Sequence, residues 1–466
     1  MEFLVVNLIT RFQYLLIVLL SLVLLFTVPV HLTIIILLLI IILSLRFDSK
    51  YWLLVTILTF TIISRDEFES IRAVIVFLSI IFLFLSFIKE FGLRISKYPQ
   101  LPWEVITFLF LVVFSLIISV SASSNFMISL ISAIRLLVFF IICYFFYSFI
   151  HGFDSVLFYI KSLLIISFVI SISIYYDFLL EGFSFFLSSG VLARFTGISD
   201  NPNFVGLVTM ISTILILSFL HLKRFSSKTY KSVFYMLLIN NFFIFLIIAS
   251  RAAVIGTILG SVFLLFFINK KLLRTTLIIG ISTIIVLFLI TPVRDFLLIV
   301  IRLEDFSIRE YLWTAGIEIF NDNLLTGIGP STFRIEFYSY IPSSIITFFN
   351  MRFDLSEKNP HPHNFFLLMG AENGILGLLF SLAIFILFFY LGLKLLKLTK
   401  NLYSEVYKVT LAFIAVGIGT FFRAFFEVSG IMSYGYISRD LPFWLIFISL
   451  IYLYHSQKYR TIKVNI

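Results

Sequence analysis

Residues 364–393 read NFFLLMGAENGILGLLFSLAIFILFFYLGL, thirty residues in which Glu372 is the only charged side chain. A helix of about 20 apolar residues crosses the hydrocarbon core of a bilayer, so this stretch predicts a membrane span. Similar apolar runs recur along the whole chain. Together with the first they lie near 14–29, 31–45, 52–64, 71–88, 104–120, 127–149, 156–180, 204–222, 232–249, 252–269, 274–291, 364–393, 407–427 and 440–456.

The composition agrees with these runs. Hydrophobic residues make up 61% of the 466-residue chain, charged residues 12%, and the mean hydropathy is +1.13. A soluble domain is about 25% charged, so a soluble globular enzyme and a disordered chain are both excluded. We therefore predict an all-α, polytopic helical membrane protein with 12–14 transmembrane helices. The range reflects the first three runs, which are short, and the first two, which could form one re-entrant hairpin.

The chain reads as one integral membrane domain in four parts. Residues 1–180 and 181–291 hold transmembrane helices, and the second part carries outer-face arginines. Residues 292–363 form one long extramembrane loop, in which apolar residues at helical spacing predict an amphipathic helix over 308–320 and a turn at 327–330. Residues 364–466 complete the helical bundle. The first run lacks a cleavage site and a second run follows at once, so we expect no cleavable signal peptide.

The net charge of +10 is explained by topology and not by nucleic acid. With both termini placed on the cytoplasmic side, the inner loops carry 14 Lys and 6 Arg, whereas the outer face carries 10 Arg and 1 Lys. A solvated membrane anchor works equally well with either residue, but bidentate binding of phosphate or carboxylate requires the planar guanidinium of Arg. The outer face is thus expected to bind an anion. Alternatively, its arginines pair with local acids such as Glu304 and Glu310.

Two short segments place arginines at the outer membrane surface. Arg194 opens a turn-rich loop that ends at Asn203 and leads into a span, and Asn or Asp in this loop can cap the next helix. Ser250-Arg251 joins two spans with almost no loop, so Arg251 must point into the bundle or toward lipid headgroups. Arg309 begins the expected amphipathic helix, on or near its polar face.

The densest polar motif is His361-Pro362-His363-Asn364, where the long loop re-enters the membrane. A histidine at this boundary can exchange a proton near neutral pH, and Asn364 can cap the following helix. A zinc site would need further ligands, and the other histidines lie elsewhere on this topology, so we expect no metal. Glu372 is a carboxylate inside an apolar span, which indicates either function or a structural partner for an inward arginine. We expect Arg423 and Glu427, four residues apart in a late span, to form a structural pair.

A series of motifs along the chain resembles the O-antigen ligase and O-antigen polymerase family. In order, these motifs are the Arg194–Asn203 loop, Ser250-Arg251, Arg309 with Trp313 and Gly327-Ile-Gly, and His363-Asn364 with Glu372-x-Gly374-x-x-Gly377. The resemblance covers about residues 190–380, and no single motif is specific. It implies a bacterial inner-membrane glycosyltransferase whose site faces the periplasm. The donor would be a glycan on undecaprenyl pyrophosphate, transferred with inversion and with neither metal nor cofactor.

The resemblance also implies roles for individual residues. Arg251 and Arg309, with Arg194, would hold the pyrophosphate, and His363 would be the base that activates the acceptor hydroxyl. Asn203 and His361 are further candidates for substrate binding, and Glu372 for catalysis. The partners would be the undecaprenyl-pyrophosphate-linked oligosaccharide, an acceptor, membrane lipids and a chain-length regulator, with no nucleic acid.

Two acceptors are compatible with these motifs. A polymerase uses another lipid-linked repeat unit, and the His-Pro-His-Asn pattern favours it; a ligase uses lipid A-core. Protein O-oligosaccharyltransferases also belong to this group, but their large C-terminal soluble extension is missing here. A flippase for lipid-linked sugars is the alternative from another class, and it would need more polar groups within the spans and an internal repeat.

Overall fold

The computed structural model describes residues 69–92, 98–182, 184, 194–199, 201–291, 294, 306–342, 360–399, 404–434 and 436–464. Its regular elements are helices, and ten of those described are long and apolar enough to cross a membrane. This confirms the predicted all-α polytopic membrane protein. The three expected spans at 14–29, 31–45 and 52–64 lie outside the described residues, so the predicted number of 12–14 is tested only from 69 onward.

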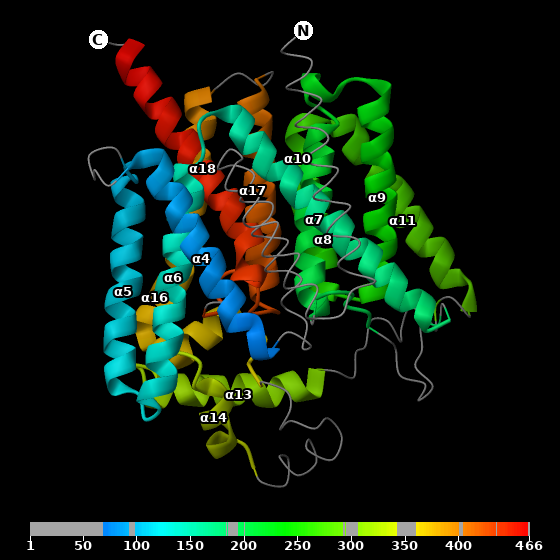
Figure 1. Cartoon of the computed structure of the whole chain (residues 1–466). Coiled ribbons are helices and arrows are strands. Elements are labelled where there is room, and N and C mark those ends of the chain that lie inside the picture. The colour runs from blue at the N-terminus through cyan, green and yellow to red at the C-terminus, as the bar shows by residue number, and fades with distance from the viewer. Residues whose placement is uncertain are drawn as a thin grey trace.

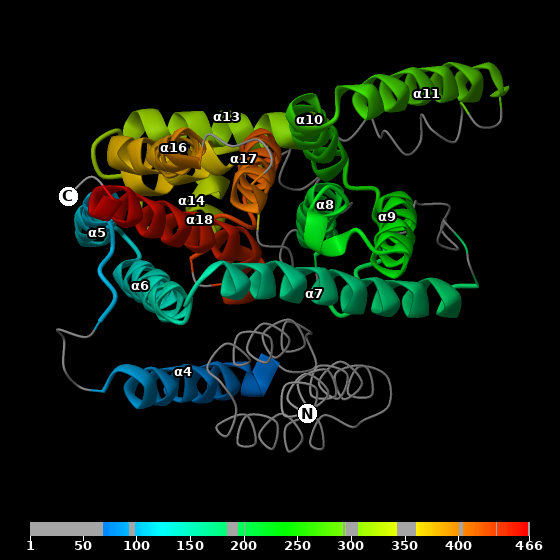
Figure 2. The same ribbon diagram turned by 90° about the horizontal axis from the view of Figure 1, so that it is seen from above.

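The helices follow the predicted apolar runs closely. They are α4 (Glu69–Phe91), α5 (Trp103–Ala122), α6 (Phe126–Ser148), α7 (Phe153–Leu180), α8 (Pro202–Phe219), α9 (Lys228–Ile248), α10 (Arg251–Ile268), α11 (Lys270–Leu289), α16 (Phe365–Thr399), α17 (Glu405–Ala424) and α18 (Ile437–Val464). Outside the spans lie the short η3 (Lys223–Phe225), α13 (Phe306–Asp322), α14 (Phe333–Glu336) and η5 (Phe337–Tyr340). Most spans run side by side in one bundle, and α7 crosses it obliquely (Figures 1 and 2).

Small residues bring α8, α10 and α17 into close contact. A Cβ added to Gly256 of α10 would lie 2.7 Å from the carbonyl oxygen of Gly419 in α17, and Gly260 approaches Ala415 in the same way. Small residues at such positions let helix backbones approach in a membrane. Gly206 of α8 lies equally close to Ser250 at the start of α10. The packing therefore gathers the beginnings of α8 and α10 and the end of α17 at one end of the bundle, which we call the site face.

Helix α16 is interrupted at Gly374, whose φ of 64° and ψ of −156° are not helical. The interruption frees backbone groups that a membrane cannot solvate. The long loop satisfies them: the amides of Ile328 and Gly329 donate to the carbonyls of Ala371 (3.1 Å) and Glu372 (2.8 Å), and the amide of Ile375 donates to Leu324 (2.7 Å). The Gly-Ile-Gly turn predicted at 327–330 is thus the part of the loop that docks into the break.

Helix α13 confirms the amphipathic helix expected over 308–320. It runs across the ends of the spans on the site face (Figure 1). Leu312, Ala315 and Ile319 are buried on one side, and α13 packs against α16. The opposite side exposes Ile317 and Glu318. The amphipathic pattern therefore serves contact with the rest of the protein.

Candidate active site

The His361-Pro362-His363 segment is held between α13 and the start of α16. The indole N–H of Trp313 donates to the carbonyl of Pro362 (2.6 Å), which fastens the segment to α13. The side chain of Asn364 accepts from the amide of Leu367 (3.1 Å), so it caps the next helix as expected. His363 has a φ of 47°, in the left-handed region, and its amide donates to Nδ1 of His361 (3.3 Å). The backbone of the segment is thus held to α13 and α16, and the ring of His361 is held by the amide of His363.

His363 faces a buried glutamate that the sequence did not single out as functional. Its Nδ1 lies 3.7 Å from Oε2 of Glu427; 31% of the histidine side chain is exposed, against 2% of the glutamate. Because the Nδ1 atom is itself buried, the exposed part of the ring is its other edge. A carboxylate on one side of an imidazole orients the ring and stabilises its protonated form. His363 and Glu427 therefore have the arrangement of a general base and its orienting group.

Glu427 is kept ionised by its neighbours. Burial alone would raise its pKa, but the interaction with His363 and the positive charge of Arg423 hold the pKa of this carboxyl well below its ordinary value. The amides of Val428 (3.0 Å) and Ser429 (3.3 Å) both donate to Oε1. Charge-assisted hydrogen bonds of this kind favour the anion. The histidine thus faces a fixed negative charge.

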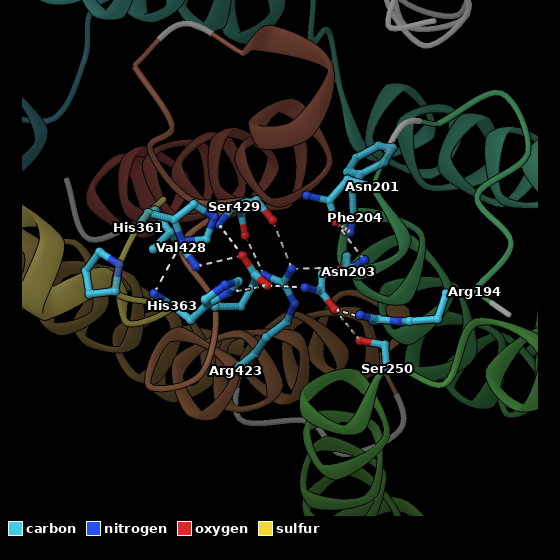
Figure 3. A network of polar contacts seen from close by, with 12 residues as sticks. Arg194, Asn201, Asn203, Phe204, Ser250, His361, His363, Arg423, Val428 and Ser429 are labelled. Atoms are coloured by element: carbon cyan, nitrogen blue, oxygen red, sulfur yellow. Dashed lines mark hydrogen bonds and ion pairs between the residues drawn. The ribbon is translucent and has the colours of Figure 1, made fainter. Parts of the chain in front are cut away.

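Asn203 connects this pair to the arginine side of the site (Figure 3). Its amide nitrogen donates to Oε2 of Glu427, and its oxygen accepts from Nη2 of Arg194 (3.1 Å) and from the hydroxyl of Ser250 (3.2 Å). Asn201 caps α8, the helix that contains Asn203, and its side-chain oxygen accepts from the backbone amide of Asn203 (2.8 Å). One network of polar contacts therefore runs from Arg194 through Asn203 and Glu427 to His363.

Three arginines were expected to bind the anion, and the structure places them around this network. Arg194 is in it, and its Nε also donates to the carbonyl of Ile248 (3.3 Å) at the end of α9. Arg251 is the first residue of α10 and lines an apolar groove of about 570 Å³ between α9 and α10. Arg309 lies one turn before Trp313 on α13.

Burial and the positive charges around His361 lower the pKa of its imidazole. Its pKa is lowered to about 3, first by burial, then by His363, and further by Arg439 and Arg309. His361 is therefore neutral at physiological pH, and His363 is the histidine whose Nδ1 faces the Glu427 carboxylate. The rings of His361 and His363 are 4.2 Å apart between centroids.

Glu372 lies at the break in α16, where the long loop docks. Its side chain is buried, and Oε1 accepts from the amide of Phe333 (3.0 Å) at the start of α14. Its carbonyl accepts from the hydroxyl of Ser119 (2.6 Å) as well as from Gly329. The network of Figure 3 does not include it. These contacts fasten the long loop to α16, so they favour the structural alternative for Glu372, although its partners are mainly backbone amides.

The expected helical pair of Arg423 and Glu427 was wrong in its geometry. Helix α17 ends at Ala424, so Glu427 leaves the helix and turns toward His363. The fully buried guanidinium of Arg423 donates to the carbonyls of Ser429 and Asn203 (2.9 Å for the latter). The signal available in the sequence was the Glu-Val-Ser-Gly motif at 427–430, whose glycine and serine indicate that the span has already ended.

The described residues contain one group that could hold a metal ion: His361, His363 and Glu427, whose ligand atoms lie within 4.8 Å of one another. Glu427 is the ligand that the sequence pattern around the two histidines does not reveal. Both oxygens of this carboxylate already accept hydrogen bonds from the protein, and cationic arginines surround the group. These features fit a metal ion poorly, and the absence of metal stays a prediction that chelation can test.

Comparison with known protein families gives a match in the middle of the chain. Residues 233–382 match the model of the family described as O-antigen ligase. Among curated proteins, no significant match is found. The matched range contains Arg251, Arg309, His363 and Glu372, whereas Arg194, Asn203 and Glu427 lie outside it. The family resemblance is confirmed over this range: the chain is a multi-pass membrane protein that carries an O-antigen ligase family domain at residues 233–382.

Proposed function

We propose that this protein is a surface-polysaccharide polymerase. It transfers a growing glycan from undecaprenyl pyrophosphate to a lipid-linked repeat unit, with inversion and without a metal ion. The observation that carries the proposal is the His363–Glu427 pair, which is joined through Asn203 to an arginine at the membrane surface. A histidine with a purely structural role would not need a buried, ionised carboxylate that is linked through Asn203 to an arginine.

The proposed site faces the periplasm of the bacterial inner membrane. The end of the bundle opposite the site face carries several lysines, among them Lys228 and Lys231 at the start of α9 and Lys270 and Lys271 at the start of α11. Short loops rich in Lys and Arg stay on the cytoplasmic side. This distribution supports a cytoplasmic position for that end and for the C-terminal end of α18, which lies there (Figure 1). We assign the N-terminus to the same side.

The arginines are proposed to hold the donor. Arg194 and Arg309 would bind the pyrophosphate oxygens in the bidentate manner of guanidinium groups. Arg251 stands at the mouth of the apolar groove that Leu238, Phe242 and Ile258 help to line. A polyprenyl chain in this groove would bring its pyrophosphate to Arg251. The groove therefore supports a lipid-linked donor over a soluble nucleotide sugar.

The transfer step follows from these positions. His363 takes the proton of the acceptor hydroxyl while the hydroxyl oxygen forms a bond to the anomeric carbon. The bond between that carbon and the pyrophosphate oxygen breaks, and undecaprenyl pyrophosphate leaves with the electron pair. The arginines stabilise the charge that develops on the leaving group, and Glu427 stabilises the imidazolium. A general base of this type contributes roughly 10²–10⁴-fold to the rate.

A ligase that transfers the glycan to lipid A-core is the second candidate, favoured by the description of the matched family. The two are separated by the lipopolysaccharide banding pattern of cells that lack the gene. A core with a single repeat unit and no ladder supports the polymerase. A bare core, with polymer accumulating on undecaprenyl pyrophosphate, supports the ligase and contradicts our first proposal. A chain-length regulator is a further proposed partner of the polymerase.

A further inference from the structure

A polar cavity lies on the site face next to the network of Figure 3, and His361, Asn201, Val428 and Ser429 of that network line it. Its volume is about 170 Å³, and it is bounded by α6, the start of α14, the His361 segment and the loop between α17 and α18. At roughly 30 Å³ for each water, the cavity has room for about five or six waters, which suits a phosphate-sized group better than a sugar chain. We call it the three-arginine cavity, after Arg135, Arg334 and Arg439, which line it.

The charge in this cavity is strongly positive. The cavity lining contains three arginines and one carboxylate, that of Glu372. The Oε1 atom of this carboxylate already accepts a hydrogen bond from the amide of Phe333. The guanidinium of Arg439 lies over the ring of Tyr436 at 4.6 Å, an arrangement that holds its planar face in place. Guanidinium groups from three separate elements are a common way to bind phosphate.

Arg135 gives the cavity independent support as a binding site. It is the tenth residue of α6, about 14 Å along a helix that otherwise reads as an apolar span. An arginine at this depth costs free energy and is usually retained for function. Among the described residues, no hydrogen bond or ion pair to Arg135 is found, and its side chain is exposed to the cavity. An anion in the cavity would provide the missing partner.

The cavity borders the proposed base. His361 lines it, and the His361 ring is 4.2 Å from that of His363. Val428 and Ser429, whose amides bind Glu427, also line it. Figure 3 shows the two histidines at one end of the network, with Arg194 and Ser250 at the other. The three-arginine cavity therefore adjoins the His363–Glu427 pair, and it also reaches Asn201 at the start of α8.

We propose that the three-arginine cavity binds the phosphate group of the acceptor, a lipid-anchored glycan that carries its own phosphate or pyrophosphate. This inference rests on the proposed function. Both substrates of the proposed polymerase carry a phosphate group, so a second cationic site beside the donor arginines would let donor and acceptor bind at the same time. Arg194, Arg251 and Arg309 serve the donor, and Arg135, Arg334 and Arg439 serve the acceptor.

The proposal predicts a selective effect on the acceptor. In a transfer assay with the purified full-length chain in lipid nanodiscs, Arg135→Gln and Arg439→Gln should raise the KM for the acceptor at least tenfold. The KM for the donor should change less than about twofold. Arg135→Lys, which keeps the charge, should be less impaired. Arg274→Gln, on an exposed arginine of α11, is the matched control and should leave both constants unchanged.

Direct binding separates failure of this inference from failure of the proposed function. With undecaprenyl phosphate as the probe, native mass spectrometry of the wild-type chain should show two bound lipids, and Arg135→Gln should show one. This result would support the cavity even if the assay showed no transfer. Two lipids retained by Arg135→Gln, together with an unchanged acceptor KM, would overturn it. Running the assay with a polyprenyl-linked repeat unit and with lipid A-core identifies which acceptor supplies the phosphate.

Discussion

Glu427 and Glu372 are both almost completely buried on the site face, with 1% and 2% of their surface exposed, yet their partners differ in kind. Glu427 contacts the side chains of Asn203 and His363, and the histidine is open to the outside. Glu372 binds a backbone amide of the long loop, beside a break in its own helix. A carboxylate inside an apolar segment indicates a costly group that the fold retains. Its use depends on whether it faces a reactive side chain or the backbone.

The largest effect is expected for His363→Ala. Loss of the general base should lower transfer by roughly 10²–10⁴-fold. The change removes a partly exposed ring, so expression and membrane insertion should stay normal. Lipopolysaccharide banding in complemented cells, with immunoblotting of the membrane fraction, measures both quantities. A full ladder from His363→Ala would remove this residue from the mechanism.

Arg309→Lys is expected to be nearly as damaging, with a loss on the order of 10²-fold. A lysine keeps the charge but cannot form the planar, bidentate contact with pyrophosphate. Initial rates of the purified variant at several donor concentrations should show the loss. Lys228→Arg, on the opposite face, is a control that should have no effect. Near-wild-type rates for Arg309→Lys would contradict the bidentate role of that residue.

The same substitution at both glutamates tests the comparison most sharply. Glu427→Gln removes the charge beside His363 and should lower kcat roughly 10–10²-fold, because the imidazolium loses its stabilising anion. Glu372→Gln keeps an oxygen that can accept from Phe333, so its kcat should change less than about threefold. Thermal unfolding of both variants controls for loss of structure. Equal kcat losses at equal stability would show that the two carboxylates do not differ in role.

A smaller effect is expected in the pH dependence of stability. The folded pKa of Glu427 lies below its unfolded value of about 4.3, so its charged form stabilises the fold. This contribution is fully present above the unfolded pKa and is lost as the pH falls through the folded pKa. Wild-type thermal stability should therefore fall more steeply below about pH 4 than that of Glu427→Gln. Parallel curves for the two proteins would argue against a lowered pKa.

The smallest effect is expected from chelation. His361, His363 and Glu427 lie close enough to bind a metal ion. The hydrogen bonds that the Glu427 carboxylate already accepts and the nearby arginines disfavour such binding. Treatment with EDTA should change the transfer rate by less than about twofold, and added Zn²⁺ or Mg²⁺ should not raise it. Loss of activity with EDTA and recovery with one metal would replace the general-base mechanism by a metal-assisted one.

The apolar runs predicted the spans well, because the length needed to cross a bilayer leaves a strong pattern in the sequence. Eleven of the predicted runs correspond to described helices. The sequence also placed Arg194, Asn203 and His363 on one face. The interruption of α16 was not predicted, because an apolar run does not reveal that Gly374 leaves the helix while the loop supplies its hydrogen bonds.

The partnership of Glu427 with His363 was missed for a different reason. It requires the end of α17 to lie beside the start of α8, and this depends on the close approach of Gly256 to Gly419. The spacing from Arg423 suggested a helical pair instead, since residues four apart share a face only where a helix continues. The three-arginine cavity likewise gathers Arg135 from α6 and Arg439 from α18, which no local pattern connects.

The most direct test of the His363–Glu427 site is a transfer assay with purified components. The full-length chain in nanodiscs is mixed with undecaprenyl-pyrophosphate-linked repeat units, and glycan length and released undecaprenyl pyrophosphate are followed together. We expect the wild type to form longer glycans and release one undecaprenyl pyrophosphate for each new linkage, and His363→Ala to do neither. Elongation by His363→Ala at the wild-type rate, or wild-type protein that moves the lipid between leaflets without lengthening the glycan, would contradict it.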